Sequence, residues 1–292
     1  MSVYSKSGAE LSEVFGINGE GLENAYDISG NLIFQSGERT SLKIMTYNVG
    51  QWYIGSGVAV PADKKTEYHN LQNGILSRNR PDLLFMQEYL DTWCQDGSLV
   101  SDLLSPYFNY REVTNPRGLI GHSICSNGIQ MSNYTVHNFT TNKGNYPTFE
   151  SAEITVGGKT ITIVNTHNDY TEPYKTQDIT DLLAFLATLD SFILCGDFNM
   201  GIYANTPTTS DNYRLGVDVF KDAGYNVGNC NPTYIPTYSG TTSITDGGAA
   251  DQIIASADIR IDNIYADTAK LTDGISDKID HLPLIAEISF LS

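Results

Sequence analysis

Short apolar runs that end in polar residues constrain the fold of this chain more than any other feature of its sequence. Near the C-terminus the pair Asp280-His281 stands beside Pro283, directly before an apolar run, at the mouth of a predicted buried strand. Four other apolar runs are broken in the same way, by Tyr47-Asn48, Gln87-Glu88, Thr166-His167 and Asp197-Phe198-Asn199. Because functional side chains gather where strands end, we expect these five strand ends to bring Asn, Glu, His and Asp side chains to one place.

The composition permits a large folded domain and restricts its partners. With 292 residues, 40% of them hydrophobic, the chain can form one large α/β domain or two small ones with a sizeable core. Its formal net charge of -17 argues against a broad electrostatic hold on nucleic acid, which needs clustered Lys and Arg. An enzyme that handles a phosphodiester locally through a metal ion remains compatible, because the cation then supplies the positive charge.

Cysteine spacing and hydropathy argue against several other classes of protein. The four cysteines share no close spacing, so neither a zinc site nor a redox pair is indicated, and Cys195 is predicted to be a buried thiol. The N-terminus has no charged start followed by an apolar core, and no run approaches the roughly 18 apolar residues of a membrane span. We therefore expect a cytoplasmic protein without stable membrane insertion.

Residues 1–40 have a different pattern from the rest of the chain. Small turn residues, a leucine and an aromatic residue followed by Ile recur about every eleven residues, which is typical of short hairpins or solenoid turns. Because so few copies cannot stand alone, we expect this N-terminal extension to pack on the domain formed by residues 41–292 or to join an assembly partner. The repeats resemble leader segments of phage and mobile-element proteins, and a plain extension is the alternative.

From residue 41 onward, apolar runs alternate with amphipathic stretches. The pattern predicts helices over 64–80, 177–189 and 211–223. It predicts strands over 42–48, 82–88, 107–113, 118–131, 148–156, 160–165, 192–195, 252–255, 259–265 and 284–290, with a two-residue turn at Gly157-Gly158. Such a mixture of hairpins and strand–helix units indicates a layered α/β architecture with mixed sheets. No Gly-x-Gly-x-x-Gly follows the first strand, which argues against a Rossmann fold.

The acidic residues suggest a metal site. Glu88 and Asp280 are hard oxygen donors that together suit Mg²⁺ or Mn²⁺, and Asn48 either completes the metal shell or is a turn residue. If Asp251 ends a neighbouring strand, its carboxylate could hold the His281 imidazole in one tautomer.

The remaining polar residues suggest chemistry on a phosphate. Asp197 and Asn199 are two apart, so an extended backbone would place both on one face. There Asp197 could deprotonate or orient a water, and Asn199 could donate to a phosphoryl oxygen; an Asx-turn is the structural alternative. His167 could donate to a non-bridging phosphate oxygen or could be a core residue.

Taken in order, these motifs resemble those of the endonuclease/exonuclease/phosphatase superfamily. That group includes pancreatic-type deoxyribonucleases, apurinic endonucleases, inositol-polyphosphate 5-phosphatases and bacterial sphingomyelinases. The match spans residues 42–291 and contains six motifs: Tyr47-Asn48, Gln87-Glu88, Asn165-Thr166-His167, Gly196-Asp197-Phe198-Asn199, Asp251-Gln252-Ile253 and Asp280-His281-Leu282-Pro283. The resemblance implies a four-layer α/β sandwich with two central mixed β-sheets flanked by helices.

The resemblance also implies roles for the site residues. Glu88 would hold the divalent metal, Mg²⁺ or Mn²⁺, with help from Asn48 and Asp280. Asp197 would position or activate the attacking water, and Asn199 would orient the phosphate. The histidines complete the implied site: His281, held by Asp251, would contact the scissile phosphate, and His167 would stabilise the developing charge.

The sequence departs from the superfamily pattern at three points. Ile279 precedes Asp280 where a serine is common, and Ser276-Asp277 offers a rival register. His167 is followed by Asn and Asp rather than by leucine. In pancreatic-type nucleases a further glutamate pairs with the histidine that matches His167, and Glu112 could fill that role here.

Three functions from different classes remain open. The first is a metal-dependent phosphodiesterase that acts on nucleic acid with little sequence preference. The second is a hydrolase of phospholipid head groups or small phosphoesters, although no apolar membrane-docking hairpin is evident. The third is a catalytically silent binding module. Four arginines are candidate phosphate contacts in the first case: Arg78, Arg80, Arg111 and Arg117.

Overall fold

The structure is a computed structural model. It describes the side chains of residues 41–50, 70–89, 104–114, 121–141, 146–199, 217–230, 235–238, 248–268 and 281–290. It also describes backbone elements at 3–4, 10–11, 24–26, 32–35, 54–55, 58–59, 65–69 and 211–216. Asp280, Cys94 and Arg117 lie outside the described residues.

The first of two central sheets has the strand order β17-β18-β5-β8-β10-β9. Its strands are β5 (Ser41–Asn48), β8 (Leu83–Tyr89), β9 (Tyr110–Thr114), β10 (Gly121–Ser126), β17 (Ile259–Ala266) and β18 (Leu284–Phe290). β5 and β8 run parallel, whereas their outer neighbours β18 and β10 run antiparallel to them. The parallel pair needs a crossover connection, and this contains helix α1 (Lys65–Asn79).

The second sheet has the order β11-β12-β13-β14-β16-β15. Its strands are β11 (Met131–Asn138), β12 (Thr148–Val156), β13 (Lys159–His167), β14 (Phe192–Asp197), β15 (Asn226–Val227) and β16 (Asp251–Ala255). Again the central pair, β13 and β14, is parallel and is flanked by antiparallel neighbours. Helix α2 (Tyr174–Leu186) lies in the connection between them. Each sheet is therefore mixed, with one parallel pair at its centre.

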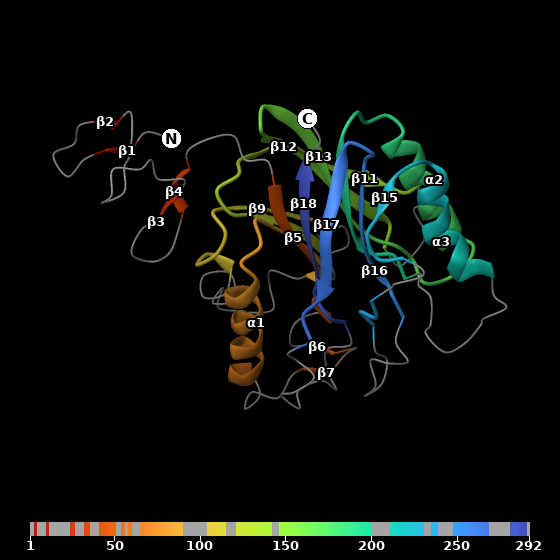
Figure 1. Ribbon diagram of the computed structural model, residues 1–292. Helices are drawn as coiled ribbons and strands as arrows, with labels where there is room; N and C mark the ends of the chain where they lie inside the picture. Colours follow the sequence, from red (N-terminus) through yellow and green to blue (C-terminus); the bar gives the residue numbers. More distant parts are fainter. Residues whose placement is uncertain are drawn as a thin grey trace.

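The helices cover the outer faces of the two sheets (Figure 1). Ile75 of α1 shares a buried cluster with Met45 of the first sheet. Leu182 of α2 and Phe220 of α3 (Asp211–Asp222) share another cluster with Leu194 of the second. Between the sheets lies a third apolar core, with contributions from both: Ile44, Phe85, Ile163, Ile193 and Ile253 among others. The predicted four-layer α/β sandwich is confirmed.

Several predicted element limits differ from the observed ones. The apolar stretch 118–131 is not one strand, because Gly128 turns the chain with a φ of 72° between β10 and β11. The strands β11 and β15 were not predicted as separate elements, and α2 begins at Tyr174 rather than at 177. The turn at Gly157-Gly158 is present, with both residues at positive φ.

Residues 1–40 contain two short antiparallel strand pairs. They are β1 (Val3–Tyr4) with β2 (Glu10–Leu11), and β3 (Asn24–Tyr26) with β4 (Leu32–Gln35). A further pair, β6 (Ile54–Gly55) and β7 (Val58–Ala59), lies between β5 and α1. The repeat architecture, the domain boundary after residue 40 and the assembly partner stay predictions.

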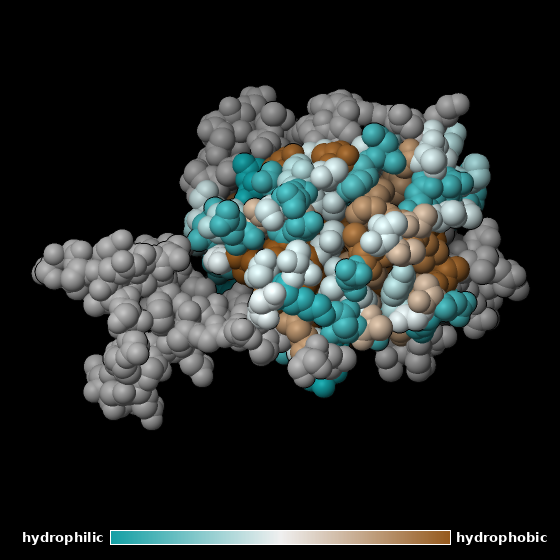
Figure 2. Space-filling view, turned by 90° about the horizontal axis from the view of Figure 1, so that it is seen from above, coloured by the Kyte–Doolittle hydropathy of each residue, from teal (hydrophilic) through white to brown (hydrophobic). Residues whose placement is uncertain are grey.

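Most large apolar side chains of the described residues are inside. Figure 2 shows hydrophilic residues interspersed with apolar ones on the face seen from above. Among the described residues the exposed large hydrophobic side chains are Val136 and Tyr170, 38% and 58% exposed. Cys195 is buried and carries a free thiol, as predicted. None of the helices that the structure describes is long and apolar enough to cross a membrane.

Candidate active site at the shared end of the two sheets

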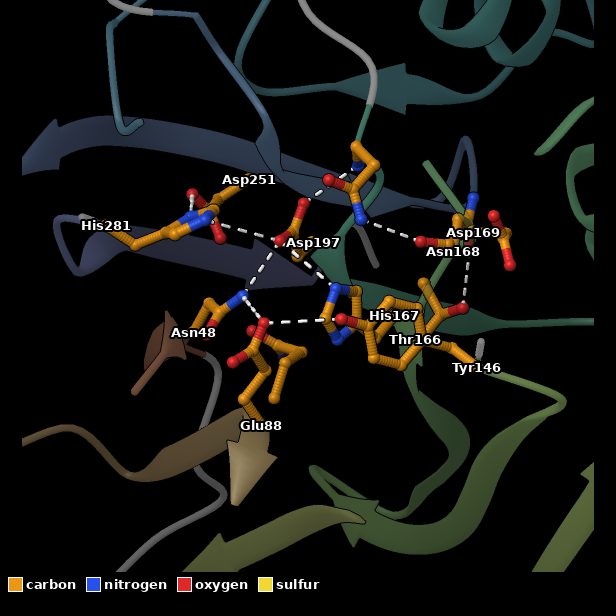
Figure 3. Close-up of polar contacts among 12 residues, drawn as sticks. Asn48, Glu88, Tyr146, Thr166, His167, Asn168, Asp169, Asp197, Asp251 and His281 are labelled. Atoms are coloured by element: carbon orange, nitrogen blue, oxygen red, sulfur yellow. Dashed lines mark hydrogen bonds and ion pairs between the residues drawn. The ribbon is translucent and has the colours of Figure 1, made fainter. Parts of the chain in front are cut away.

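The space between the sheets is apolar along most of its length and polar at one end. In β13, Ile161 and Ile163 belong to the inter-sheet core, and Asn165 and His167 follow on the same side of the strand. Other strands change in the same way: their polar side chains are Asn48 of β5 and Gln87 of β8 in the facing sheet, and Asp197 of β14 and Asp251 of β16 in the same sheet as β13. The predicted meeting of polar strand ends is therefore present (Figure 3).

A β-bulge delivers Glu88 to this end. Met86 and Tyr89 both belong to the core beneath α1, although strict alternation would place Glu88 there instead of Tyr89. The register of β8 against β10 shifts between Gly121 and Ser123, and Glu88 has a φ of 52°. Such a bulge redirects a side chain at the end of a strand. Here it brings the half-buried Glu88 carboxylate to the polar end of the inter-sheet space.

Asp197 lies at the centre of the site. Its Oδ2 accepts a hydrogen bond of 2.9 Å from Asn48 Nδ2 and lies 3.4 Å from Nε2 of both His167 and His281. Its Oδ1 accepts the backbone N–H of Asn199 at 2.8 Å. Burial raises the pKa of Asp197 to about 7, against the lowering effect of His281 and of the hydrogen bonds from Asn48 and Asn199. One carboxylate is thus shared among donors from both sheets.

The structure brings His281 and Asp251 together. His281 Nδ1 and Asp251 Oδ2 are 2.8 Å apart, and His281 Nε2 then faces Asp197. A carboxylate behind one ring nitrogen fixes the tautomer in which the other nitrogen carries its proton toward the centre of the site. Ligand atoms of Asp197, Asp251 and His281 all lie within 4.8 Å of one another, but hydrogen-bond geometry already accounts for that spacing.

His167 is held differently from His281. Burial, followed by the nearby His122 and His281, lowers the pKa of His167 well below its ordinary value, so the ring is neutral. Its Nδ1 has no hydrogen-bond partner among the described residues. Glu112, the partner suggested by the sequence, does not pair with it, because Glu112 lies on β9 opposite Ile124. That expectation was wrong. His167 is therefore a neutral donor through Nε2.

Asn199 reaches the site from a turn rather than from an extended strand. β14 ends at Asp197, and Asn199 has a φ of 47°. The bond from its N–H to Asp197 is that of an Asx-turn, the alternative that the sequence had left open. Asn199 Nδ2 donates to the carbonyl of Asn168 at 2.8 Å, which ties the ends of β13 and β14 together. The extended geometry expected for this pair is wrong, although both side chains lie at the site.

Two residues of the site were missed in the sequence. The first is Tyr146, whose ring stacks on His167 and whose hydroxyl reaches Glu88. The second is Glu150, which accepts from Asn165 in a buried network beneath the site; Asn165 in turn accepts from Gln87. Tyr146 follows no apolar run, and Glu150 lies inside a strand of alternating polar residues. Neither therefore carried a signal at a strand end.

The comparisons with known proteins rest on structure. Family models and curated proteins gave no match to the sequence. D. rerio TDP2, solved with a single strand DNA product, aligns over 85% of this chain and 99% of its own with a TM-score of 0.60 and 13% identity. The endonuclease/exonuclease/phosphatase from Beutenbergia cavernae aligns over 87% and 72%, with a TM-score of 0.62 and 14% identity. The catalytic domain of human Nocturnin, with a bound sulfate anion, aligns over 86% and 95%, with a TM-score of 0.59 and 16% identity.

The chain has the endonuclease/exonuclease/phosphatase fold. The TM-scores establish the fold, and identities this low carry no information on the chemistry, which depends on the residues of this chain. In this fold the described polar cluster occupies the end of the inter-sheet space where both parallel strand pairs terminate.

The carboxylate of Glu88 is of the chemical kind that could hold a hard divalent cation. Glu88 Oε1 accepts from Asn48 Nδ2 at 3.3 Å and from Tyr146 at 3.4 Å, both long hydrogen bonds on a carboxylate that reaches solvent. Such a carboxylate can exchange these contacts for a cation. Asn48 Oδ1 already accepts Gly50 N–H at 2.9 Å, so Asn48 orients Glu88 and Asp197 through its amino group. Asp280, the other predicted ligand, lies outside the described residues.

Proposed function

We propose that this protein is a divalent-metal-dependent phosphodiester hydrolase, and that it is a nuclease with little sequence preference. The observation that carries the proposal is the contact between Asp197 and two histidine Nε2 atoms, both 3.4 Å away, beside the carboxylate of Glu88. Two imidazole donors, one carboxylate that can accept a proton and one that suits a hard cation are the groups that hydrolysis of a phosphate ester needs.

Each group has a distinct part in the proposed reaction. Glu88 would hold Mg²⁺ or Mn²⁺, which would supply positive charge that favours attack at phosphorus. Asp197 accepts the proton of the attacking water as the new P–O bond forms and the bond to the leaving oxygen breaks; solvent protonates that oxygen. His167 and His281 donate through Nε2 to the non-bridging oxygens, where negative charge increases. Asp251 keeps the His281 proton on the nitrogen that faces the phosphate.

Three observations favour nucleic acid over a lipid head group. Tyr170 exposes an aromatic ring, 58% accessible, three positions after His167, and aromatic rings bind bases by stacking. D. rerio TDP2, which shares the fold, was solved with a single strand DNA product. A hydrolase that docks on a membrane needs a group of exposed apolar side chains. Among the described residues, the exposed large apolar side chains lie singly.

The first experiment tests the reaction and the residues together. The protein is incubated with supercoiled plasmid, single-stranded RNA and an aryl phosphodiester, in Mg²⁺, Mn²⁺ or chelator. We expect metal-dependent nicking that falls by about 10³-fold in Asp197→Asn and His281→Ala. Asp190→Asn is the matched control, because this exposed carboxylate lies just before the start of β14, at the opposite end of the strand from Asp197. Cleavage of the aryl diester alone would favour small phosphoesters, and no turnover of any substrate would contradict the proposal.

The positions of the basic residues predict weak electrostatic binding. Arg78 and Arg80 precede β8, and Arg111 lies level with Leu84 near the start of that strand, whereas Glu88 lies near its end. Arg78 is also paired with Asp267 at 3.0 Å. With few cations at the site among the described residues, we expect the logarithm of plasmid affinity to fall with the logarithm of salt at a slope shallower than about -3. Titration of labelled DNA with Asp197→Asn in Ca²⁺ measures the slope, and a value near -6 would contradict this expectation.

A further inference from the structure

Tyr146 lies between two residues of the proposed site that come from different sheets, His167 of β13 and Glu88 of β8. It lies two residues before β12, the antiparallel neighbour of β13, beside the end of the strand that carries His167. Its ring and the imidazole of His167 have centroids 3.5 Å apart and planes inclined by 20°, which is a stacked arrangement. Its hydroxyl lies 3.4 Å from Oε1 of Glu88, the proposed metal ligand on the first sheet (Figure 3).

The stack replaces the hydrogen bond that ordinarily orients such an imidazole. His281 is oriented from behind by Asp251, at 2.8 Å. His167 has no hydrogen-bond partner on Nδ1 among the described residues, so none of these residues fixes the rotation of its ring by a hydrogen bond from behind. Contact between two nearly parallel rings restricts that rotation, because tilting the imidazole would break the stack. The ring of Tyr146 therefore keeps His167 Nε2 directed at Asp197, 3.4 Å away.

The hydroxyl of Tyr146 contacts Glu88, the proposed metal ligand on the first sheet. Tyr146, just before β12, and Asn48 of β5 both donate to Oε1 of Glu88, at 3.4 Å and 3.3 Å. A phenol is protonated at neutral pH and is a hydrogen-bond donor to a carboxylate. These two donors hold a carboxylate whose backbone stands in the left-handed region, with a φ of 52°. A group that orients a metal-binding carboxylate in this way acts on metal affinity without touching the metal.

We propose that Tyr146 is a positioning residue that holds His167 through its ring and Glu88 through its hydroxyl. The inference rests on the proposed function, since it assigns Glu88 to the metal and His167 to the phosphate. Tyr146 thus has two separable roles. The hydroxyl sets the affinity of the site for the metal, and the aromatic ring sets the orientation of the imidazole.

Two substitutions separate the role of the hydroxyl from that of the aromatic ring. Tyr146→Phe keeps the stack and removes the donor, whereas Tyr146→Leu removes both. Mn²⁺ binding to the protein alone, measured by calorimetry, should weaken about 10-fold in both variants. The ¹⁵N-resolved ring signals of His167, assigned with His167→Gln, should be unchanged in Tyr146→Phe and shifted in Tyr146→Leu. In activity assays, Tyr146→Phe should raise the Mg²⁺ requirement at an unchanged maximal rate, and Tyr146→Leu should lower the maximal rate.

Tyr107→Phe is the matched control, because the hydroxyl of Tyr107 donates to Asn73 at 2.6 Å on the outer face of the first sheet. It should change neither Mn²⁺ binding nor the His167 signals. Wild-type affinity in Tyr146→Phe, or unchanged His167 signals in Tyr146→Leu, would overturn the corresponding half of the inference. Wild-type protein that bound no Mn²⁺ would instead contradict the proposed metal site, and the ring signals would still decide whether Tyr146 holds His167.

Discussion

Glu88 carries its carboxylate on a left-handed backbone, with a φ of 52°. Any side chain with a Cβ is strained there, whereas glycine is not. Glu88→Gly should therefore be more stable than Glu88→Ala by about 1 kcal/mol, although glycine ordinarily weakens a strand. Urea unfolding of the two variants measures the difference, and both should lose metal-dependent activity because both lack the carboxylate.

The same two substitutions at Glu153 provide the control for this comparison. Glu153 lies inside β12 and is not among the residues with positive φ. There Glu153→Gly should be the less stable variant, by about 1 kcal/mol. If alanine were at least as stable as glycine at Glu88 too, the bulge would store no backbone strain, and the placement of the carboxylate would need another explanation.

At the scale of elements, Gly196 sets the spacing of the parallel pair β13–β14. A Cβ on Gly196 would lie 2.1 Å from the carbonyl oxygen of Thr166 on the neighbouring strand, a distance that real Cβ atoms do not reach. Gly196→Ala must therefore move one strand and, with it, the adjacent Asp197. We expect a loss of about 3 kcal/mol in the free energy of unfolding, together with lost activity. Thermal and urea unfolding measure the loss.

Gly158→Ala separates this steric effect from the conformational freedom of glycine. Gly158 has a φ of 75° in the turn between β12 and β13, and a Cβ there would have no atom within 4 Å. Its replacement should cost about 1 kcal/mol and leave activity unchanged. Equal losses at Gly158 and Gly196 would show that the close approach to Thr166 is not the cause.

The sequence predicted where the strands lie better than where they end. The predicted strand 192–195 continues to Asp197, and 160–165 continues to His167. The apolar pattern that predicts a strand ends where polar side chains begin, but the backbone hydrogen bonds between strands do not depend on side chains. The residues that lengthen these strands are those of the site. Asn48, Glu88, Asp251 and His281 were predictable from their motifs, because each follows or precedes an apolar run.

At the scale of the whole molecule, the residues that the sequence could not assign make contacts between neighbouring strands and between the two sheets. Tyr146 and Glu150 acquire their roles through the register of β12 against β13 and through the facing sheet, which no local pattern encodes. Asn165 shows why: its amide donates to Glu150 at 2.9 Å and to the carbonyl of Met86, in the other sheet, at 2.9 Å. Its Oδ1 accepts from Gln87 at 2.7 Å. A buried polar network thus joins the two sheets directly beneath the site.

This network makes the stability of the molecule depend on pH through Glu150. Burial raises the pKa of Glu150 from 4.5 to about 8, against the lowering effect of hydrogen bonds from Tyr134 and Asn165. Between these values the folded protein retains a proton that the unfolded chain has lost. The contribution of Glu150 to the free energy of unfolding therefore falls as pH rises through this window, and this contribution is level below 4.5 and above about 8. From pH 6 to pH 8 the contribution falls by on the order of 2 kcal/mol.

Glu150→Gln isolates this contribution because glutamine cannot titrate. Its Oε1 can still accept from Asn165, and its amino group can donate to the hydroxyl of Tyr134. The wild-type protein should lose stability relative to Glu150→Gln between pH 6 and pH 8 in urea titrations. Glu153→Gln, which removes a partly exposed carboxylate of the same strand, should follow the wild-type curve. Since all other titrating groups are common to the two proteins, parallel curves for wild type and Glu150→Gln would mean that Glu150 is already ionised between the sheets.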